Sequence, residues 1–260
     1  MKSWIWTSLA AAVLLAAAPA RAIDVWDQAT EDDNSSGTDN GLIHGAEQLH
    51  DLGAVAATAD QDWYTLDSQA RSSYEVVIDG TTGDMNLAGS DVQRIDDDGT
   101  TVLQDSTSLA GYSRVLRWTN NSSTAEENFI RVQGASCGTI CSANDQYRIR
   151  MYETTYSIPR FNNTGGQITV LNVASMVPFS CAASFHFYNN AGTFLGTQTN
   201  NFTARELFVF NTSTAGFAAG TSGSIIVAHN CGYGGLAGKA VALEPATGFT
   251  FDTALIPRII

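Results

Sequence analysis

Residues 23–260 contain no segment with a helical period and capping residues, and this absence most constrains the possible fold. Short segments instead alternate apolar and polar residues, which is the period of a half-buried β-strand. In residues 146–152, Tyr147, Ile149 and Met151 fall on one face and two arginines on the other. The segments expected to form strands are residues 74–79, 112–118, 128–133, 146–152, 167–173, 184–188, 206–210, 224–229 and 240–243. Gly- and Asn-rich turns separate them, so the sequence predicts an all-β chain built as two antiparallel β-sandwiches.

Charge divides the chain into two parts. Residues 23–156 carry 17 Asp and 6 Glu against 7 Arg, a net charge of −16, whereas residues 157–260 have a net charge of +1. Pro159 and the Asn- and Gly-rich residues 162–166 lie where the composition changes. We therefore expect two domains, residues 23–156 and an Ig-like sandwich in residues 157–260. The total of −13 disfavours a duplex nucleic-acid binder, since such a protein needs a basic surface.

The N-terminus has the pattern of a secretory signal peptide. Lys2 precedes an apolar stretch in residues 4–18, and Ala20 and Ala22 are small residues at the positions read by a signal peptidase. We expect residues 1–22 to be removed and the mature protein to be secreted or held at the cell surface. A retained membrane anchor is the alternative, but the apolar stretch is short for a membrane span.

Four cysteines agree with export to an oxidising compartment. We expect the disulfides Cys137–Cys141 and Cys181–Cys231, because each pair then stays within one proposed domain. The spacing of Cys137 and Cys141 also occurs in zinc sites, but no second close pair or nearby histidine completes four ligands.

Two acidic segments could together hold a calcium ion. Calcium takes six to eight oxygen ligands, and separated acidic segments can wrap around it. The alternative is a solvated acidic segment followed by the start of a strand. The expected metal ligands are Glu31, Asp33, Asn34, Asp60 and Asp62.

A set of motifs in residues 26–153 resembles the bacterial pre-peptidase C-terminal domain. These are Asp60-Gln61-Asp62-Trp63-Tyr64, the strand in residues 74–78, the turn Asp96-Asp97-Asp98-Gly99 and the closing strand in residues 147–150. The resemblance implies a jelly-roll-like sandwich that accompanies secreted enzymes and surface proteins. The segment Glu31 to Ser35 resembles the family's opening motif Glu-Pro-Asn-Asp-Ser. The resemblance also implies calcium, since related collagen-binding domains bind calcium near this opening segment. Asp32 stands where the family has Pro, and Asp33 and Asn34 reverse the family's order.

The C-terminal half resembles an uncharacterised β module of secreted bacterial proteins.

Two glycine motifs have structural explanations. Asp98-Gly99 would be the centre of an EF-hand loop, but Arg94 would then be the first ligand, so a hairpin turn explains the motif better. Gly238-Lys239 lacks the earlier glycine of a phosphate-binding loop, so turns of a sandwich are expected there.

The sequence gives little support for catalysis. It has four histidines, no Gly-x-Ser-x-Gly and no His-Glu-x-x-His. We expect a non-catalytic binding, adhesion or surface-structural protein with an extracellular protein or glycan ligand. The alternatives are a carboxylate-based glycan hydrolase and a self-assembling surface subunit whose apolar C-terminal residues 254–260 complete a neighbour's sheet.

Aromatic residues offer the candidate binding groups. Phe185 and Phe187 share one face of an expected strand and are typical of a core. Tyr188, Tyr233 or Trp26 could instead be exposed platforms for sugar rings.

Overall fold

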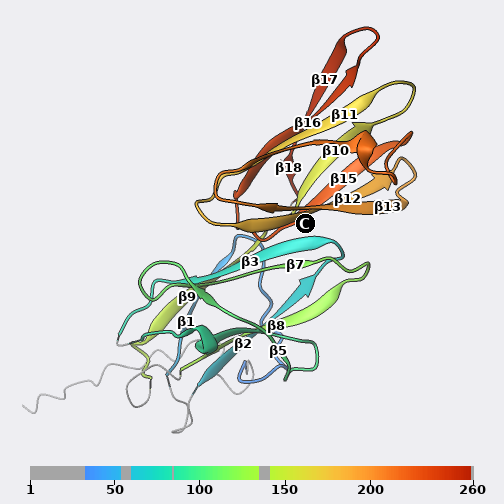
Figure 1. The fold of residues 1–260 in the computed structure, drawn as a ribbon. Helices are drawn as coiled ribbons and strands as arrows, with labels where there is room; N and C mark the ends of the chain where they lie inside the picture. Colours follow the sequence, from blue (N-terminus) through green and yellow to red (C-terminus); the bar gives the residue numbers. More distant parts are fainter. Residues whose placement is uncertain (1–32, 54–59, 84, 135–140, 259–260) are drawn as a thin grey trace, which may run out of the picture.

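The computed structural model describes residues 33–53, 60–83, 85–134 and 141–258. These residues form two lobes, one above the other in Figure 1, and each lobe contains two antiparallel sheets. The described residues contain no α-helix, only the short 3-10 segments η2 (Gly89–Asp91) and η3 (Thr212–Thr214). The expected all-β sandwich architecture is therefore confirmed. The expected signal peptide, residues 1–22, lies outside the described residues, and no helix within them is long and apolar enough to cross a membrane.

The N-terminal lobe, residues 33–153, packs a five-stranded sheet of order β1-β9-β3-β7-β6 against a four-stranded sheet of order β2-β8-β4-β5. Its strands are β1 (Glu47–Asp51), β2 (Gln61–Ser68), β3 (Ser72–Asp79), β4 (Val92–Ile95), β5 (Val102–Asp105), β6 (Thr107–Ser108), β7 (Arg114–Asn120), β8 (Glu126–Gln133) and β9 (Gln146–Glu153). The alternation in β9 works as predicted, because Tyr147, Ile149 and Met151 are buried in the core between the sheets. Gly99 adopts a positive φ of 68° in the turn from β4 to β5, which confirms a hairpin turn there.

The C-terminal lobe, residues 156–258, pairs a five-stranded sheet of order β13-β12-β15-β10-β18 with a four-stranded sheet of order β14-β11-β16-β17. Its strands are β10 (Tyr156–Asn162), β11 (Ile168–Ser175), β12 (Cys181–Asn189), β13 (Phe194–Phe202), β14 (Leu207–Asn211), β15 (Ser222–His229), β16 (Leu236–Glu244), β17 (Phe249–Ala254) and β18 (Ile256–Pro257). Phe185 and Phe187 are fully buried in its core, as expected. Gly238 and Lys239 lie within β16, not in the expected turn. An added Cβ at Gly238 would lie 2.4 Å from the Asn172 carbonyl oxygen, so close packing of strands explains this glycine.

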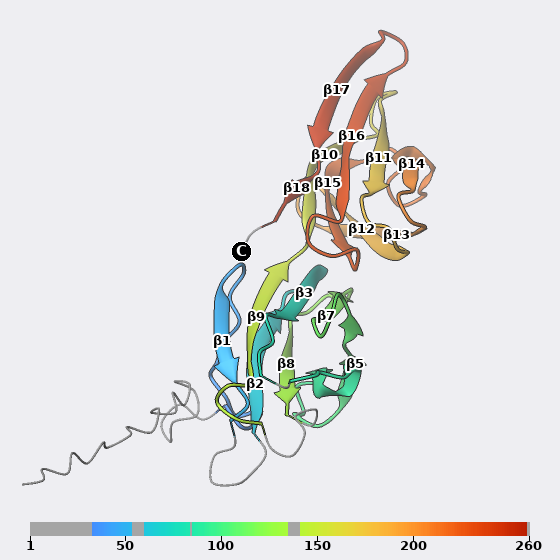
Figure 2. The ribbon, with the colours of Figure 1, turned by 90° about the vertical axis from the view of Figure 1, so that its left-hand side faces the viewer.

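Strand β10 corrects one expectation. The change in composition placed the domain boundary near Pro159, but residues 156–162 form a strand that pairs with both β15 and β18. Pro159 is tolerated because the register shifts between Ile158 and Phe161, and a bulge is where a strand can lack an N–H donor. Only Thr154 and Thr155 separate β9 from β10, and Figure 2 shows the chain passing directly from one lobe to the other.

Strand pairing and cores respect the division into lobes. Every ladder between the described strands joins strands of one lobe, and each lobe has its own large cluster of buried apolar residues. The described part of the apolar C-terminal segment pairs within the chain, as Ile256 and Pro257 of β18 lie opposite Ser157 and Tyr156. These residues therefore complete a sheet of their own chain.

Candidate functional site

A buried group of potential metal ligands lies in the N-terminal lobe. Asp33 precedes β1, His50 lies in β1 and Asp62 lies in β2. One ligand atom from each residue lies within 4.8 Å of the other two, and the three residues are 0%, 1% and 0% exposed. The chain is held in place here because Trp63 of β2 donates its backbone N–H to the Asp33 carbonyl oxygen at 2.8 Å. This is a site enclosed by the sandwich.

Hydrogen bonds orient the His50 ring. Gln48 donates its side-chain amide to the Gly41 carbonyl oxygen at 3.2 Å, which leaves its Oε1 facing His50 Nε2 at 3.0 Å. Because an amide oxygen only accepts, His50 Nε2 carries the ring proton. The other ring nitrogen, Nδ1, lies 3.8 Å from Asp33 Oδ2. Histidines that bind a metal commonly donate their other ring N–H to an oxygen acceptor in this way.

Two tyrosines support the opposite side of the group. Tyr147 of β9 donates its hydroxyl hydrogen bond to Asp62 Oδ2, and the Tyr64 and Tyr147 hydroxyl oxygens lie 2.6 Å apart. Burial, and then the neighbouring Asp62 carboxylate, raise the pKa of Tyr147 well above its ordinary value. Tyr147 therefore remains a neutral donor, which favours the ionised form of Asp62 that a cation requires.

The structure brings together only part of the expected calcium set. Asp33 and Asp62 meet, whereas Asn34 is exposed and Glu31 lies outside the described residues. Asp60 is buried, and its Oδ1 accepts the Gln61 backbone N–H at 2.9 Å. His50 was not among the expected ligands, because a lone histidine carries no spacing signal.

The donor set fits a divalent ion that accepts imidazole. Zinc accepts both carboxylate oxygen and imidazole nitrogen, so these three side chains supply three of the four ligands of a tetrahedral zinc site. Calcium would need six to eight oxygens, more than these three residues supply. Because the ligands are buried, an ion bound here would join the segment before β1 to β1 and β2, and its effect would be structural.

One disulfide was expected in each lobe. Cys181 and Cys231 form the expected disulfide across the start of β12 and the loop after β15. Cys137 lies outside the described residues, so the pairing Cys137–Cys141 stays a prediction.

A backbone hydrogen bond joins the two lobes at the Glu75 carboxylate, which also forms an ion pair within its own lobe. Glu75 of β3 accepts from Arg117 of β7 at 2.7 Å and from the backbone N–H of Tyr233, also at 2.7 Å. Tyr233 belongs to the loop between β15 and β16 of the other lobe. Gly232 has a φ of +86°, and an added Cβ there would lie 2.9 Å from the Arg117 side chain. The loop can approach the first lobe because this residue is glycine.

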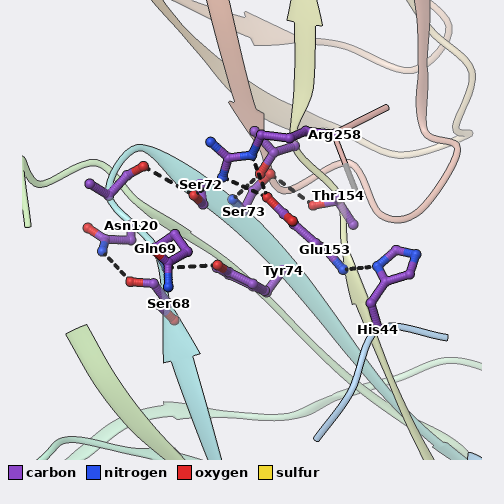
Figure 3. Close-up of polar contacts among 12 residues, drawn as sticks. His44, Ser68, Gln69, Ser72, Ser73, Tyr74, Asn120, Glu153, Thr154 and Arg258 are labelled. Atoms are coloured by element: carbon purple, nitrogen blue, oxygen red, sulfur yellow. Dashed lines mark hydrogen bonds and ion pairs between the residues drawn. The ribbon is translucent and has the colours of Figure 1, made fainter. Parts of the chain in front are cut away.

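A second polar contact joins the lobes near the chain's end, as Figure 3 shows. Arg258 donates two hydrogen bonds to Glu153 Oε1, at 2.6 and 2.8 Å, and another to the Ser72 hydroxyl. The Glu153 backbone N–H donates to His44 Nδ1 at 2.9 Å, so the neutral ring presents its other nitrogen as an N–H donor. Thr154 also contacts Ser73. This contact ties the described end of the chain to β3 and β9.

An aromatic group and a pocket lie beside this contact. The rings of Tyr152 and Tyr233 stack with centroids 4.6 Å apart, and the His44 ring meets both edge-on at 6.0 Å. Tyr233 is 55% exposed. A pocket of about 320 Å³ adjoins His44. It is lined by Gly41, Leu42, Ile43, His44, Thr65, Leu66, Asp67, Gln69, Tyr74, Met151 and Glu153.

The other proposed sugar platforms differ from Tyr233. Tyr188 is half-buried at the end of β12, where its ring meets Phe194 edge-on, with centroids 5.8 Å apart. Trp26 lies outside the described residues. Tyr233 is therefore the exposed member of the three within the described structure.

Comparison with known proteins gives no assignment. No family model and no curated protein matches the sequence significantly. Solved structures with similarity include a glycosyl hydrolase family 2 member from Bacteroides cellulosilyticus, at 11% identity and a TM-score of 0.24, covering 80% of this chain and 31% of that chain. A Bacteroides uniformis β-glucuronidase has 11% identity and a TM-score of 0.21, covering 81% of this chain and 32% of that one. The chain spans about a third of the length of these proteins. At these TM-scores the similarity carries no inference about activity.

Proposed function

We propose that the protein is an exported, non-catalytic binding or adhesion protein whose N-terminal lobe is stabilised by one divalent metal ion. The observation that carries this proposal is the burial of Asp33, His50 and Asp62. A catalytic metal keeps a coordination position open to substrate, whereas these ligands lie inside the sandwich. An ion here would stabilise the folded state without reaching a substrate.

Export is supported by the signal-like residues 1–22 and by the disulfide Cys181–Cys231, which forms in an oxidising compartment. The resemblance of residues 26–153 to a domain of secreted bacterial proteins agrees with this location. The expected calcium is a second candidate for the ion, but the imidazole of His50 favours zinc.

A thermal melt with different metals tests the proposal. Zinc added to chelator-treated protein should raise the melting temperature more than calcium or magnesium, since binding to the folded state alone adds about 2.7 kcal/mol at a hundredfold excess over Kd. Asp62→Asn and His50→Asn should abolish the shift, while Asp97→Asn, at an exposed turn, should keep it. Equal shifts with zinc and magnesium, unaffected by Asp62→Asn, would point to charge screening of the acidic lobe and reject the site.

The alternative function, a carboxylate-based glycan hydrolase, has one structural feature in its favour. Asp67 and Glu153 line the same pocket, and hydrolases of this kind use two carboxyl groups. Glu153, however, is engaged by Arg258 through the two hydrogen bonds to Oε1. Release of reducing sugar from a glycan panel, lost in both Asp67→Asn and Glu153→Gln, would replace the binding proposal with the hydrolase.

A further inference from the structure

We propose that Tyr233 and the pocket beside His44 form a binding site for a neutral oligosaccharide. This inference rests on the proposed binding function and names its ligand class. Sugar rings bind to proteins through the flat apolar face of an aromatic side chain and through hydrogen bonds at the hydroxyl edges. The surface at the lobe junction supplies both.

Tyr233 supplies the aromatic face. Tyr152 covers one side of its ring, at a centroid distance of 4.6 Å, and yet 55% of Tyr233 remains exposed. The outer side of the ring is therefore open to solvent. The Glu75 carboxylate fixes the Tyr233 backbone N–H at 2.7 Å, and Gly235 donates to the Gly232 carbonyl oxygen at 2.9 Å. A platform held in this way loses little conformational entropy when a ring stacks on it.

The pocket supplies the polar edges and the space. His44 belongs both to the aromatic group and to the pocket lining, so the two surfaces meet at this residue. Its Nδ1 is occupied by the Glu153 backbone N–H, which leaves Nε2–H as the donor for a ligand. Asp67 and Gln69 are exposed acceptors and donors on the same pocket. A volume of about 320 Å³ lies at the lower end of ligand pockets.

The negative charge of the N-terminal lobe favours a neutral glycan over an acidic one. Residues 23–156 have a net charge of −16, and Asp67 adds an exposed carboxylate at the pocket itself, whereas Glu153 is paired with Arg258. An acidic polysaccharide would be repelled by this surface, whereas neutral sugars donate hydroxyl hydrogen bonds to carboxylates. Ile43, which is 69% exposed at the rim, adds apolar contact area.

Calorimetry and affinity electrophoresis on the full chain test this site. The probes are soluble β-glucan, mannan, xylan and chitin oligosaccharides, with alginate and polygalacturonate as acidic counterparts. We expect retention of at least one neutral glycan and of neither acidic one. Tyr233→Ala should weaken the affinity by roughly tenfold or more, whereas Tyr233→Phe should keep most of it, because the stacking face remains. Gln69→Ala should weaken it several-fold.

Tyr112→Ala is the matched control, because Tyr112 is 52% exposed but lies outside both the aromatic group and the pocket. Melting curves of all variants show whether each still folds. Neutral-glycan binding that is equal in the wild type, Tyr233→Ala and Gln69→Ala would overturn this site while leaving the protein a binding protein. Binding of acidic glycans alone, or of no glycan, would also overturn it. Cleavage of the bound glycan would instead overturn the non-catalytic function.

Discussion

The backbone N–H of Tyr233 donates a hydrogen bond of 2.7 Å to the side chain of Glu75, although the two residues belong to different lobes. The same carboxylate binds Arg117, whose guanidinium lies 4.9 Å from the centroid of the Phe179 ring in the other lobe. Glu75 is 6% exposed, so this contact is shielded from water. The lobes therefore share one buried carboxylate.

Replacing Glu75 should weaken this junction. Glu75→Gln should lower the free energy of unfolding by about 1–3 kcal/mol, since Gln keeps only one of the two acceptor oxygens and removes the negative charge beside Arg117. Glu47→Gln is the control, because Glu47 pairs with Arg148 at 3.4 Å on an exposed surface, where ion pairs contribute little. Urea denaturation measures both, and equal losses in the two variants would contradict the role given to Glu75.

The disulfide Cys181–Cys231 should be a large source of stability in the C-terminal lobe. It closes a separation of 50 residues, which the chain-entropy model values at about 4 kcal/mol. The double variant Cys181→Ala/Cys231→Ala should melt at a clearly lower temperature than the wild type. Non-reducing peptide mapping should recover this link together with Cys137–Cys141, and a Cys141–Cys181 peptide would reject the pairing.

Stability should fall as the solution becomes acidic. Burial lowers the pKa of His229 to about 4 in the folded protein, against 6.5 for an ordinary histidine, and Nδ1 accepts the Cys231 N–H at 3.1 Å. Between these values the unfolded chain binds a proton that the folded chain does not. Stability is therefore lost as the pH falls from about 6.5 to about 4, by on the order of 3 kcal/mol.

His229→Asn tests this assignment, because Asn keeps an acceptor near the Nδ1 position and does not titrate. Unfolding free energies at pH 7 and pH 4.5 should differ less in the variant than in the wild type. His186, whose pKa burial and Arg71 also lower to about 4, should leave part of the pH dependence in place. Identical pH dependence in variant and wild type would contradict the role of His229.

Each lobe should fold without the other, since each has its own core and its own pair of sheets. The sequence placed the start of the second domain at Ser157, but Tyr156 belongs to β10 and stacks on His229 at 5.4 Å. A fragment of residues 154–260 should therefore show a cooperative melt and a β-type circular dichroism spectrum. An insoluble or unfolded fragment would contradict the independence of the lobes.

The regular strands were predictable because alternation records which face is buried. Residues 74–79 and 146–152 were expected as strands and lie in β3 and β9. Strand β13 was missed because its polar residues pair with β12 along an edge of the sheet. Strand β10 was missed because Pro159 signals a break unless a neighbouring bulge accommodates it.

The candidate metal centre was half predictable. Asp33 and Asp62 stand in acidic segments, and their meeting could be proposed from composition. His50 could not be predicted as a third ligand, since its position near the two aspartates depends on the pairing of β1 with β9. The paired residues of these two strands are about 100 residues apart in the sequence. Pairings of this kind leave no local trace in the sequence.

The central claim is that Asp33, His50 and Asp62 hold one divalent ion. Its most direct test is the metal content of the folded protein, measured by inductively coupled plasma mass spectrometry after equilibration with zinc and calcium and removal of excess metal. The account predicts one zinc ion per chain in the wild type and in Asp97→Asn, and none in Asp62→Asn or His50→Asn. A wild-type protein without stoichiometric metal, or a metal content unchanged in Asp62→Asn and His50→Asn, would contradict it.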